Sequence, residues 1–302
     1  MLDGVLEVLE CELAQRPETV VLYADALPEG LRPLISIDAE RVINVGIAET
    51  TLASLAGGLA STGLRPVVLG LAPFLASRAY SQIRQDVALG CLGVTFIGLA
   101  GGATLADMGP THCTLDDVGL MGLQPSVELA VARDSSSAAA LLRHLLAIEG
   151  TGYLRVEASR AGAHQDAPFG GTQRLRDGDD ATVIVTGAVT SDAVHAADEL
   201  GAVGIKTGVV SVLKLRPLDP EPLQTALSAG PVLIVEEHVA HGGLAALIRG
   251  ALPEASGAVI GHLTPSAYSS PTSFSPNDFR VDADTIRRGV LDLLAHPNHT
   301  RP

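Results

Sequence analysis

Short runs of aliphatic and β-branched residues alternate with longer helical segments along almost the whole chain. Residues 42–45 and 65–70 are two such runs, and stretches with helical spacing at 50–62 and 72–89 follow them. This alternation predicts an α/β fold with mainly parallel sheets. Aromatic residues make up only 3% of the chain and hydrophobic residues 47%, so we expect an aliphatic core, as in sheets that are buried on both faces.

The alternation falls into two blocks, and the length of 302 residues is sufficient for two domains. A polar, glycine-rich stretch between the blocks predicts a linker over residues 164–178. We therefore expect a first domain over 1–163 and a second over 179–302. Each should be a mainly parallel sheet flanked by helices.

The charge of the chain bears on its partners. The formal net charge is −14, and Lys206 and Lys214 are the only lysines, so the sequence lacks the clustered cations of a nucleic-acid binder. Arginine should therefore build any anion site. No apolar run reaches the roughly 20 residues of a membrane span, and the acidic N-terminal segment lacks signal-peptide features.

The cysteines Cys11, Cys91 and Cys113 are widely spaced, and no pair has the spacing of metal ligands. An odd number of cysteines does not suggest a disulfide framework. A reducing, cytoplasmic setting is therefore expected.

One acidic residue, Glu49, lies where an extended run ends and a helix of small residues begins. Ligands of open parallel sheets bind at the carboxyl ends of the strands, where such a residue would be displayed. A glutamate at a helix N-terminus can also simply complement the helix dipole. Taken alone, this stretch leaves both interpretations open.

Three further residues, Phe74, Arg78 and His112, also lie at or beyond the ends of predicted strands. Phe74 could pack in the core or offer a stacking platform. His112 lies in a loop over residues 100–114, and loops of this length in compact domains are usually functional. The sequence contains no phosphate-binding GxxxxGK[ST] loop, HExxH motif or GxSxG motif.

Taken together, these residues make the chain resemble the transketolase family of thiamine-diphosphate enzymes. NVGIAE at 44–49 resembles the family signature around its glutamate, and GPTH at 109–112 resembles its histidine loop. RAYSQIRQDVAL at 78–89 is similar to a helix of deoxyxylulose-phosphate synthase. LRPLDP at 215–220 and VEEHVAHGG at 235–243 are similar to the transketolase C-terminal domain.

The resemblance implies that the chain holds the pyrimidine-binding domain (1–163) and the transketolase C-terminal domain (179–302) of a split enzyme. The family's diphosphate-binding domain, which holds Mg²⁺ or Ca²⁺ through a GDG…N motif, has no counterpart in this sequence. A partner subunit carrying that domain and the metal is implied, in an α2β2 heterotetramer. No metal ligand is expected in this chain. The implied activity is transfer of a two-carbon ketol unit.

The resemblance also implies roles for individual residues. Glu49 would be catalytic and bond the pyrimidine ring of thiamine diphosphate, and Phe74 would stack on that ring, with Ile47 and Leu71 as further cofactor contacts. His112 would be catalytic and bond the substrate.

Arg78, Arg155, Arg160 and Asp107 would join His112 in binding an anionic ketose or aldose substrate. Each arginine could equally form a surface or interface ion pair. Met108 occupies the place of a sugar-binding aspartate of the family, which predicts a non-standard donor or acceptor in a specialised pathway.

Two alternatives remain at this point. The β subunit of a 2-oxoacid dehydrogenase has the same two-domain arrangement, and a non-catalytic regulatory subunit could retain the fold. Glu49 argues against the regulatory subunit.

Overall fold

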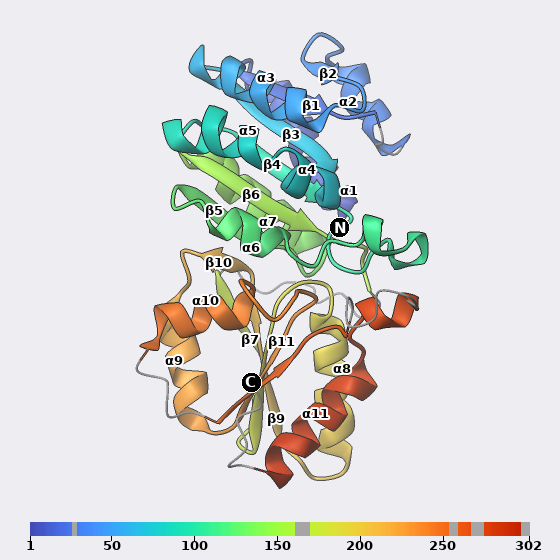
Figure 1. Ribbon diagram of the computed structural model, residues 1–302, viewed down its shortest axis with the longest axis vertical. Helices are drawn as coiled ribbons and strands as arrows, with labels where there is room; N and C mark the ends of the chain where they lie inside the picture. Colours follow the sequence, from blue (N-terminus) through green and yellow to red (C-terminus); the bar gives the residue numbers. More distant parts are fainter. Residues whose placement is uncertain (26–28, 161–169, 254–258, 267–274, 297–302) are drawn as a thin grey trace.

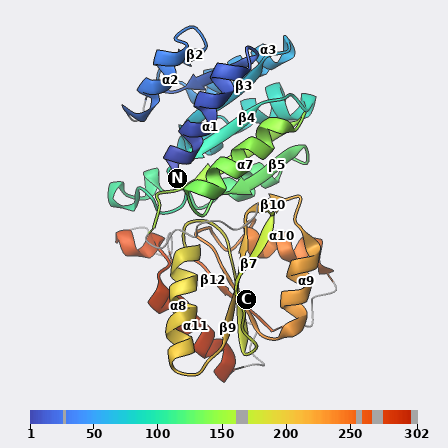
Figure 2. The ribbon, with the colours of Figure 1, turned by 180° about the vertical axis from the view of Figure 1, so that it is seen from behind.

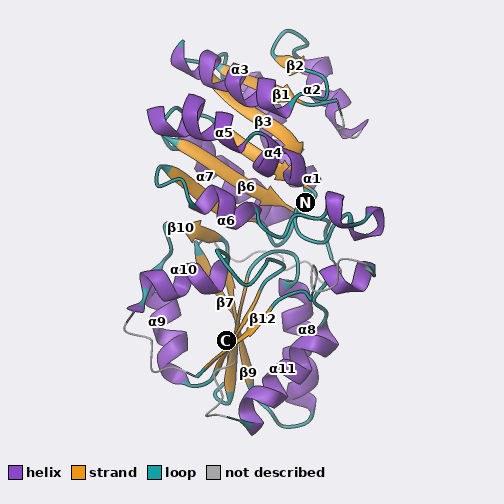
Figure 3. Ribbon diagram, viewed as in Figure 1, coloured by secondary structure: helices purple, strands orange, loops and turns teal. Residues whose placement is uncertain are grey.

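The computed structural model describes residues 1–25, 29–160, 170–253, 259–266 and 275–296. Two α/β halves lie end to end, and the chain passes from the first into the second once its sixth strand is complete (Figure 1). Helices cover both faces of each sheet (Figure 3). The α/β fold with two mainly parallel sheets, predicted from the alternating pattern, is thus confirmed.

The first sheet has seven strands in the order β10-β5-β6-β4-β3-β1-β2, and all pairings except that of β10 are parallel. Its first six strands are β1 (Thr19–Tyr23), β2 (Val42–Asn44), β3 (Arg65–Leu71), β4 (Thr95–Leu99), β5 (Val127–Val131) and β6 (Thr151–Val156). Its helices are α1 (Leu2–Gln15), α2 (Arg32–Ile37), α3 (Glu49–Ser61), α4 (Ala72–Arg78), α5 (Tyr80–Gln82), α6 (Asp117–Gly122) and α7 (Ser135–Ala147). Helices α1 and α7 lie together on one face, seen from behind in Figure 2.

The second sheet has five strands in the order β12-β11-β8-β9-β7. Its strands are β7 (Thr172–Arg176), β8 (Ala181–Val185), β9 (Thr207–Val212), β11 (Val232–Val235) and β12 (Ile260–Leu263), and β10 (Lys214–Arg216) follows β9 in the chain. Its helices are α8 (Thr190–Ala202), α9 (Pro220–Ala229), α10 (Leu244–Ala251) and α11 (Ala283–Ala295). Helices α8 and α11 cover one face, and α9 and α10 cover the other (Figure 1).

The segment between the halves differs from its prediction. The sequence predicts a linker over residues 164–178, but residues 172–176 of that segment form β7, an antiparallel edge strand on β9. Residues 164–169 lie outside the described residues. The alternation of polar and apolar side chains in a short edge strand resembles that of a solvated loop, because only one face of such a strand is buried.

Two further elements were not apparent in the sequence pattern. The helix predicted over 72–89 is divided into α4, α5, a π-helical turn η2 (Ile83–Val87) and a 3-10 turn η3 (Ala88–Gly90). Strand β10 leaves the second half and pairs antiparallel with β5 of the first sheet, with Lys214 opposite Ala130. This pairing ties the two halves through backbone hydrogen bonds.

The core is mainly aliphatic, as the composition predicts. One apolar cluster lies on each face of the first sheet, and both clusters continue into the second half, one of them through Ala188 and Leu213. In the other cluster, Val118 and Met121 of α6 pack with Leu215 and Leu244. The two halves therefore share a hydrophobic interface. No helix among the described residues is long and apolar enough to cross a membrane.

Candidate functional site at the carboxyl edge of the first sheet

Glu49 begins α3 directly after the turn that follows β2. Gly46 in this turn has a φ of +75°, a conformation that favours glycine, and its amide donates to the Asn44 side chain at 2.9 Å. The Glu49 side chain is only 3% exposed. The partial positive charge of the helix N-terminus favours a carboxylate there, which offsets part of the cost of burying it.

Phe74 and His112 reach the same edge from the next two strands along the chain. Phe74 lies in the first turn of α4, which begins immediately after β3, and Pro73 is tolerated in this turn. His112 ends the short 3-10 turn η5 (Pro110–His112), in the loop that follows β4. Strands β2, β3 and β4 run parallel in one sheet, so their carboxyl ends face the same side, where Figure 1 shows this loop.

The four residues form one continuous chain of contacts. Arg78 Nη1 lies 2.8 Å from Glu49 Oε2, and the Arg78 guanidinium carbon lies 5.0 Å from the centre of the Phe74 ring. The Phe74 and His112 ring centres are 5.4 Å apart at an interplanar angle of 81°, an edge-to-face arrangement. The structure thus brings together Glu49, Phe74, Arg78 and His112.

Solvent exposure differs sharply across this cluster. Glu49 is buried, whereas the Arg78 side chain is 52% exposed, so their ion pair connects a buried carboxylate to the protein surface. Ile47 is 71% exposed and Met108 is 58% exposed, while Leu71 is half-buried. Through Arg78, the cluster joins a buried carboxylate, which can form hydrogen bonds, to an aromatic ring, which can stack.

Arg155 has its contacts elsewhere. Its side chain is 3% exposed and lies at the junction of the two halves, where Nη1 is 3.3 Å from Asp117 Oδ1 and Nη2 is 2.8 Å from Glu157 Oε1. Nη2 also donates to the backbone carbonyl of Glu237 at 2.9 Å. Burial raises the pKa of Glu157 above its usual range, although the Arg155 charge acts in the opposite direction. Both ion pairs lie within the first half, and the hydrogen bond to the Glu237 carbonyl is the contact that reaches the second half.

Arg160 and Asp107 also form ion pairs near this junction. Arg160 bonds Asp192 at 2.6 Å and also bonds the carboxylate of Glu237. Asp107 is highly exposed and faces Arg280 at 3.5 Å. The contacts described for these two residues do not join them to Glu49.

A cavity of about 270 Å³ lies beside these pairs and is lined by Ala103, Thr104, Glu157, Ala158, Arg160, Ala188, Glu237 and Arg280. The sequence did not single out Glu157 or Glu237 as functional candidates. Each lies within two residues of the end of an apolar strand, β6 or β11, and acidic side chains are seldom buried there without a specific partner.

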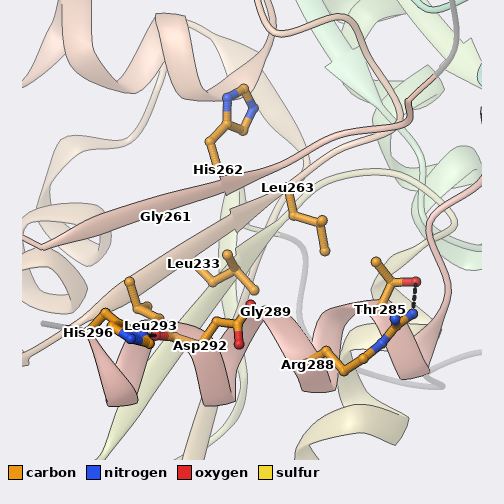
Figure 4. Close-up of a pocket in the computed structure, with 10 residues that line it drawn as sticks. All are labelled: Leu233, Gly261, His262, Leu263, Thr285, Arg288, Gly289, Asp292, Leu293 and His296. Atoms are coloured by element: carbon orange, nitrogen blue, oxygen red, sulfur yellow. Dashed lines mark hydrogen bonds between the residues drawn. The ribbon is translucent and has the colours of Figure 1, made fainter. Parts of the chain in front are cut away.

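A larger hollow of about 440 Å³ lies in the second half, between β12 and α11 (Figure 4). Leucines 233, 263 and 293 line it, with Arg288 and Asp292 on the helix side. His262 points to the opposite face of β12, where its ring bonds Glu236 at 2.9 Å. None of the candidate residues named above lines this hollow.

The described residues include no group of three or more His, Cys, Asp or Glu side chains placed to hold a metal ion. Cys11, Cys91 and Cys113 are free thiols, and of the three only Cys113 is buried.

Comparisons with known proteins agree with this arrangement. Residues 1–161 match the family model for the transketolase pyrimidine-binding domain, and residues 170–277 match the transketolase C-terminal domain. The chain belongs to the transketolase family, whose members depend on thiamine diphosphate, and the resemblance noted from the sequence is confirmed.

Individual relatives are of two lengths. A 1-deoxy-D-xylulose-5-phosphate synthase of Heliobacterium modesticaldum is 34% identical over 78% of this chain but only 38% of its own length. One of the subunits of the apulose-4-phosphate transketolase of Actinobacillus succinogenes is 31% identical over 74% of each protein. The 6-deoxy-6-sulfo-D-fructose transketolase subunit SqwH of a Clostridium species is 32% identical over 68% of this chain and 65% of its own. The chain therefore spans well under half of the synthase and about three quarters of the apulose-4-phosphate transketolase subunit.

A solved structure described as a split gene transketolase in an inactive beta4 tetramer has a TM-score of 0.86 and 26% identity. The match covers 97% of both chains. The two halves of this protein are thus arranged as in that single polypeptide.

Proposed function

We propose that this chain is the C-terminal (beta) subunit of a two-component transketolase, which transfers a two-carbon ketol unit with a partner subunit. The observation that carries the proposal is the buried Glu49 carboxylate in contact with Arg78, within a cluster that also contains Phe74 and His112. The apulose-4-phosphate transketolase subunit and the split transketolase structure, both similar to most of this chain, support the two-component organisation.

The residues fit the pyrimidine half of thiamine diphosphate. When bound, this cofactor would supply a thiazolium carbon that bonds the carbonyl carbon of the donor and takes up the electron pair of the adjacent carbon–carbon bond as that bond breaks. Glu49 would hold a proton against a ring nitrogen of the pyrimidine, and Phe74 would pack on the ring, with Ile47 and Leu71 beside it. His112 would donate a hydrogen bond to a substrate oxygen as charge develops there.

The partner would supply the diphosphate-binding domain and its Mg²⁺ or Ca²⁺, in a cytoplasmic α2β2 heterotetramer. Free thiols at the exposed Cys11 and Cys91 favour a reducing compartment.

The substrates are proposed to include a non-standard donor or acceptor. Met108 is exposed on the His112 loop, where a methionine cannot accept a hydrogen bond from a sugar hydroxyl as a carboxylate would. Of the arginines proposed for substrate binding, Arg78 alone contacts the Glu49 cluster and is half-exposed. We therefore assign the anionic end of the substrate to Arg78, and a structural role to Arg155 and Arg160.

The test is reconstitution with a diphosphate-binding subunit that carries a GDG…N motif. Ketol transfer from xylulose 5-phosphate, assayed against a panel of aldehyde acceptors, should require both chains, thiamine diphosphate and Mg²⁺. Glu49→Gln should lower kcat by about 10²-fold or more, because proton transfer at the cofactor loses its partner. Glu40→Gln, at an exposed glutamate, is the matched control.

Equal activity of Glu49→Gln and the wild-type chain would refute the catalytic assignment. Release of CO₂ from pyruvate or branched 2-oxo acids, without ketol transfer, would favour a 2-oxoacid dehydrogenase subunit instead. Rapid ordinary turnover with ribose 5-phosphate would refute the altered specificity.

A further inference from the structure

The loop that carries His112 has little regular structure of its own. A two-bond backbone bridge closes it, with Gly102 N donating to Thr114 O at 3.1 Å and Thr114 N donating to Gly102 O at 3.0 Å. Between them lie only two short 3-10 turns, η4 (Ala106–Met108) and η5. A loop of this kind is held by what surrounds it, so the contacts around it decide where His112 lies.

Glu237 of the second half reaches this loop directly. It follows β11 and is only 5% exposed, and its Oε2 accepts a hydrogen bond from Ala103 N at 3.3 Å. Its other oxygen accepts from Val281 N at 3.1 Å and from the Arg160 guanidinium. One buried carboxylate therefore joins the start of the His112 loop to two other segments.

The two residues after Glu237 hold the far end of the same loop. Val239 N donates to Leu115 O at 2.6 Å, and Gly119 N donates to His238 Nε2 at 3.1 Å. Residues 237–239 of the second half thus contact both ends of the segment that contains His112.

Side chains close the loop against the second half as well. Ala103, Ala106, Cys113 and Leu115 form a buried apolar cluster with Phe279, and Val239 packs against it. Phe279 ends the turn η7 (Pro276–Phe279), which lies next to η4 at the boundary of the halves (Figure 1).

The backbone at the neck of the loop leaves no room for a larger residue. Gly102 has a φ of +62°, and a Cβ atom there would lie 2.5 Å from Arg155 Nη2 and 3.0 Å from Glu237 Oε2. The Gly102 backbone therefore lies directly against the charged side chains of the junction, where a larger residue would clash.

We propose that the second domain is the frame that positions His112, and that Glu237 is the positioning residue at its centre. The inference rests on the proposed function for the role of His112 in the reaction. Glu237 does not touch Glu49 or Phe74. It acts through Ala103 and the loop, and thereby gives the second domain a part in substrate recognition.

The substitution that tests this role is Glu237→Gln. The glutamine keeps the size of the side chain but has only one acceptor oxygen, and its other terminal group is a neutral NH₂. The oxygen should face Arg160 and Val281, because that orientation keeps two hydrogen bonds, so the NH₂ group faces Ala103 N–H. The hydrogen bond to the loop is then lost, and the negative charge opposite Arg160 disappears.

The chain contains a matched control in the preceding residue. Glu236 is also buried, but its carboxylate accepts from Leu244 N at 2.6 Å and Ala245 N at 3.0 Å, at the start of α10 in its own domain. Glu236→Gln removes the same charge from the same strand end without touching the His112 loop.

Hydrogen exchange of the full-length chain, read by mass spectrometry, is the first measurement. In Glu237→Gln we expect amides of residues 103–114 to exchange about tenfold faster or more, because the loop opens locally. In Glu236→Gln the same amides should exchange at the wild-type rate. Equal exchange in Glu237→Gln and wild type would overturn the proposal.

The second measurement uses the reconstituted enzyme. Glu237→Gln should lower kcat/KM for the substrate by about 10²-fold, because small displacements of a catalytic group are costly, while the apparent affinity for thiamine diphosphate stays unchanged. An equal loss in Glu236→Gln would show a general stability effect and would overturn the proposal.

If Glu237→Gln does not fold, Val239→Ala, which trims the apolar contact with the loop, should give the same acceleration of exchange, and its absence would overturn the proposal. If the exchange data are as expected but the wild-type chain shows no ketol transfer with its partner, the positioning frame stands and the proposed function fails.

Discussion

At the scale of single residues, Cys113 and its neighbour His112 have opposite environments. His112 meets the Phe74 ring, whereas Cys113 is 5% exposed within the apolar cluster that holds the loop. Burial raises the pKa of the Cys113 thiol to about 11, and the negative charge of Glu237 adds to this effect. The thiolate, which is the reactive form, is therefore scarce at neutral pH.

This environment predicts the order in which the cysteines react. With iodoacetamide at pH 8, the exposed Cys11 and Cys91 should be modified first, and Cys113 should react at least about 10²-fold more slowly. Its rate should continue to rise up to about pH 11, where the thiolate forms. Peptide mass spectrometry of a time course measures all three sites. Modification of Cys113 as fast as Cys11 would contradict the anchored loop.

Residue positions in the sequence predicted part of the site. Glu49, Phe74 and His112 each follow a strand of one parallel sheet, so topology alone brings them to one edge. Arg155 lies on a strand of the same sheet, yet its guanidinium is covered by Asp117 and Glu157. A sequence shows which strand a side chain belongs to, but not which buried charge of another element it meets.

At the scale of elements, α7 has the most complete N-terminal cap in the first half. Asp134 accepts from Ser137 N at 2.7 Å, and Ser137 Oγ accepts from Asp134 N at 3.0 Å, which forms a capping box. Arg133 Nε donates to the same carboxylate at 3.0 Å. Burial alone would raise the pKa of Asp134, but the bonds from Ser137 and Arg133 outweigh it and hold the pKa below its usual range.

We expect Asp134→Ala to lower the free energy of unfolding by about 1–2 kcal/mol at pH 7, as for other lost caps. Asp134→Asn keeps an acceptor oxygen, so its smaller loss isolates the contribution of the charge. Because the folded pKa is depressed, this contribution is full above the unfolded pKa of about 3.9 and is lost as the pH falls through the folded value. Urea unfolding at pH 7 and near pH 3 measures the contribution of the Asp134 charge. If Asp134→Asn were equally destabilised relative to the wild type at both pH values, the charge would not be the cause.

At the scale of the whole molecule, the junction between the halves combines three kinds of contact. Strand β10 extends the first sheet, an apolar cluster is continuous across the boundary, and the half-buried Arg160 forms ion pairs with Asp192 and Glu237 of the second half. The two-domain α/β architecture was predictable from the alternation of strands and helices. The crossing strand was not, because residues 214–216 are too few to show a period, and their pairing depends on tertiary contacts.

The buried charges at this junction predict how the molecule responds to the loss of Arg155. Arg155→Met should lower the free energy of unfolding by about 3–5 kcal/mol, because Asp117 and Glu157 are left buried without their counter-charge. Arg176→Met removes an exposed pair with Asp198 and should cost at most about 1 kcal/mol. Thermal or urea unfolding of the full-length chain compares the two variants.

The same variant decides between the two roles considered for Arg155. If the guanidinium held the anionic end of the substrate, Arg155→Met would raise KM while the free energy of unfolding stayed near the wild-type value. If Arg155 instead has a structural role at the junction, Arg155→Met should lower the free energy of unfolding. Its KM, measured well below the unfolding temperature, should stay near the wild-type value. The 3% exposure of the side chain and its three partners favour the second outcome, since a substrate cannot reach a cation that protein carboxylates already surround.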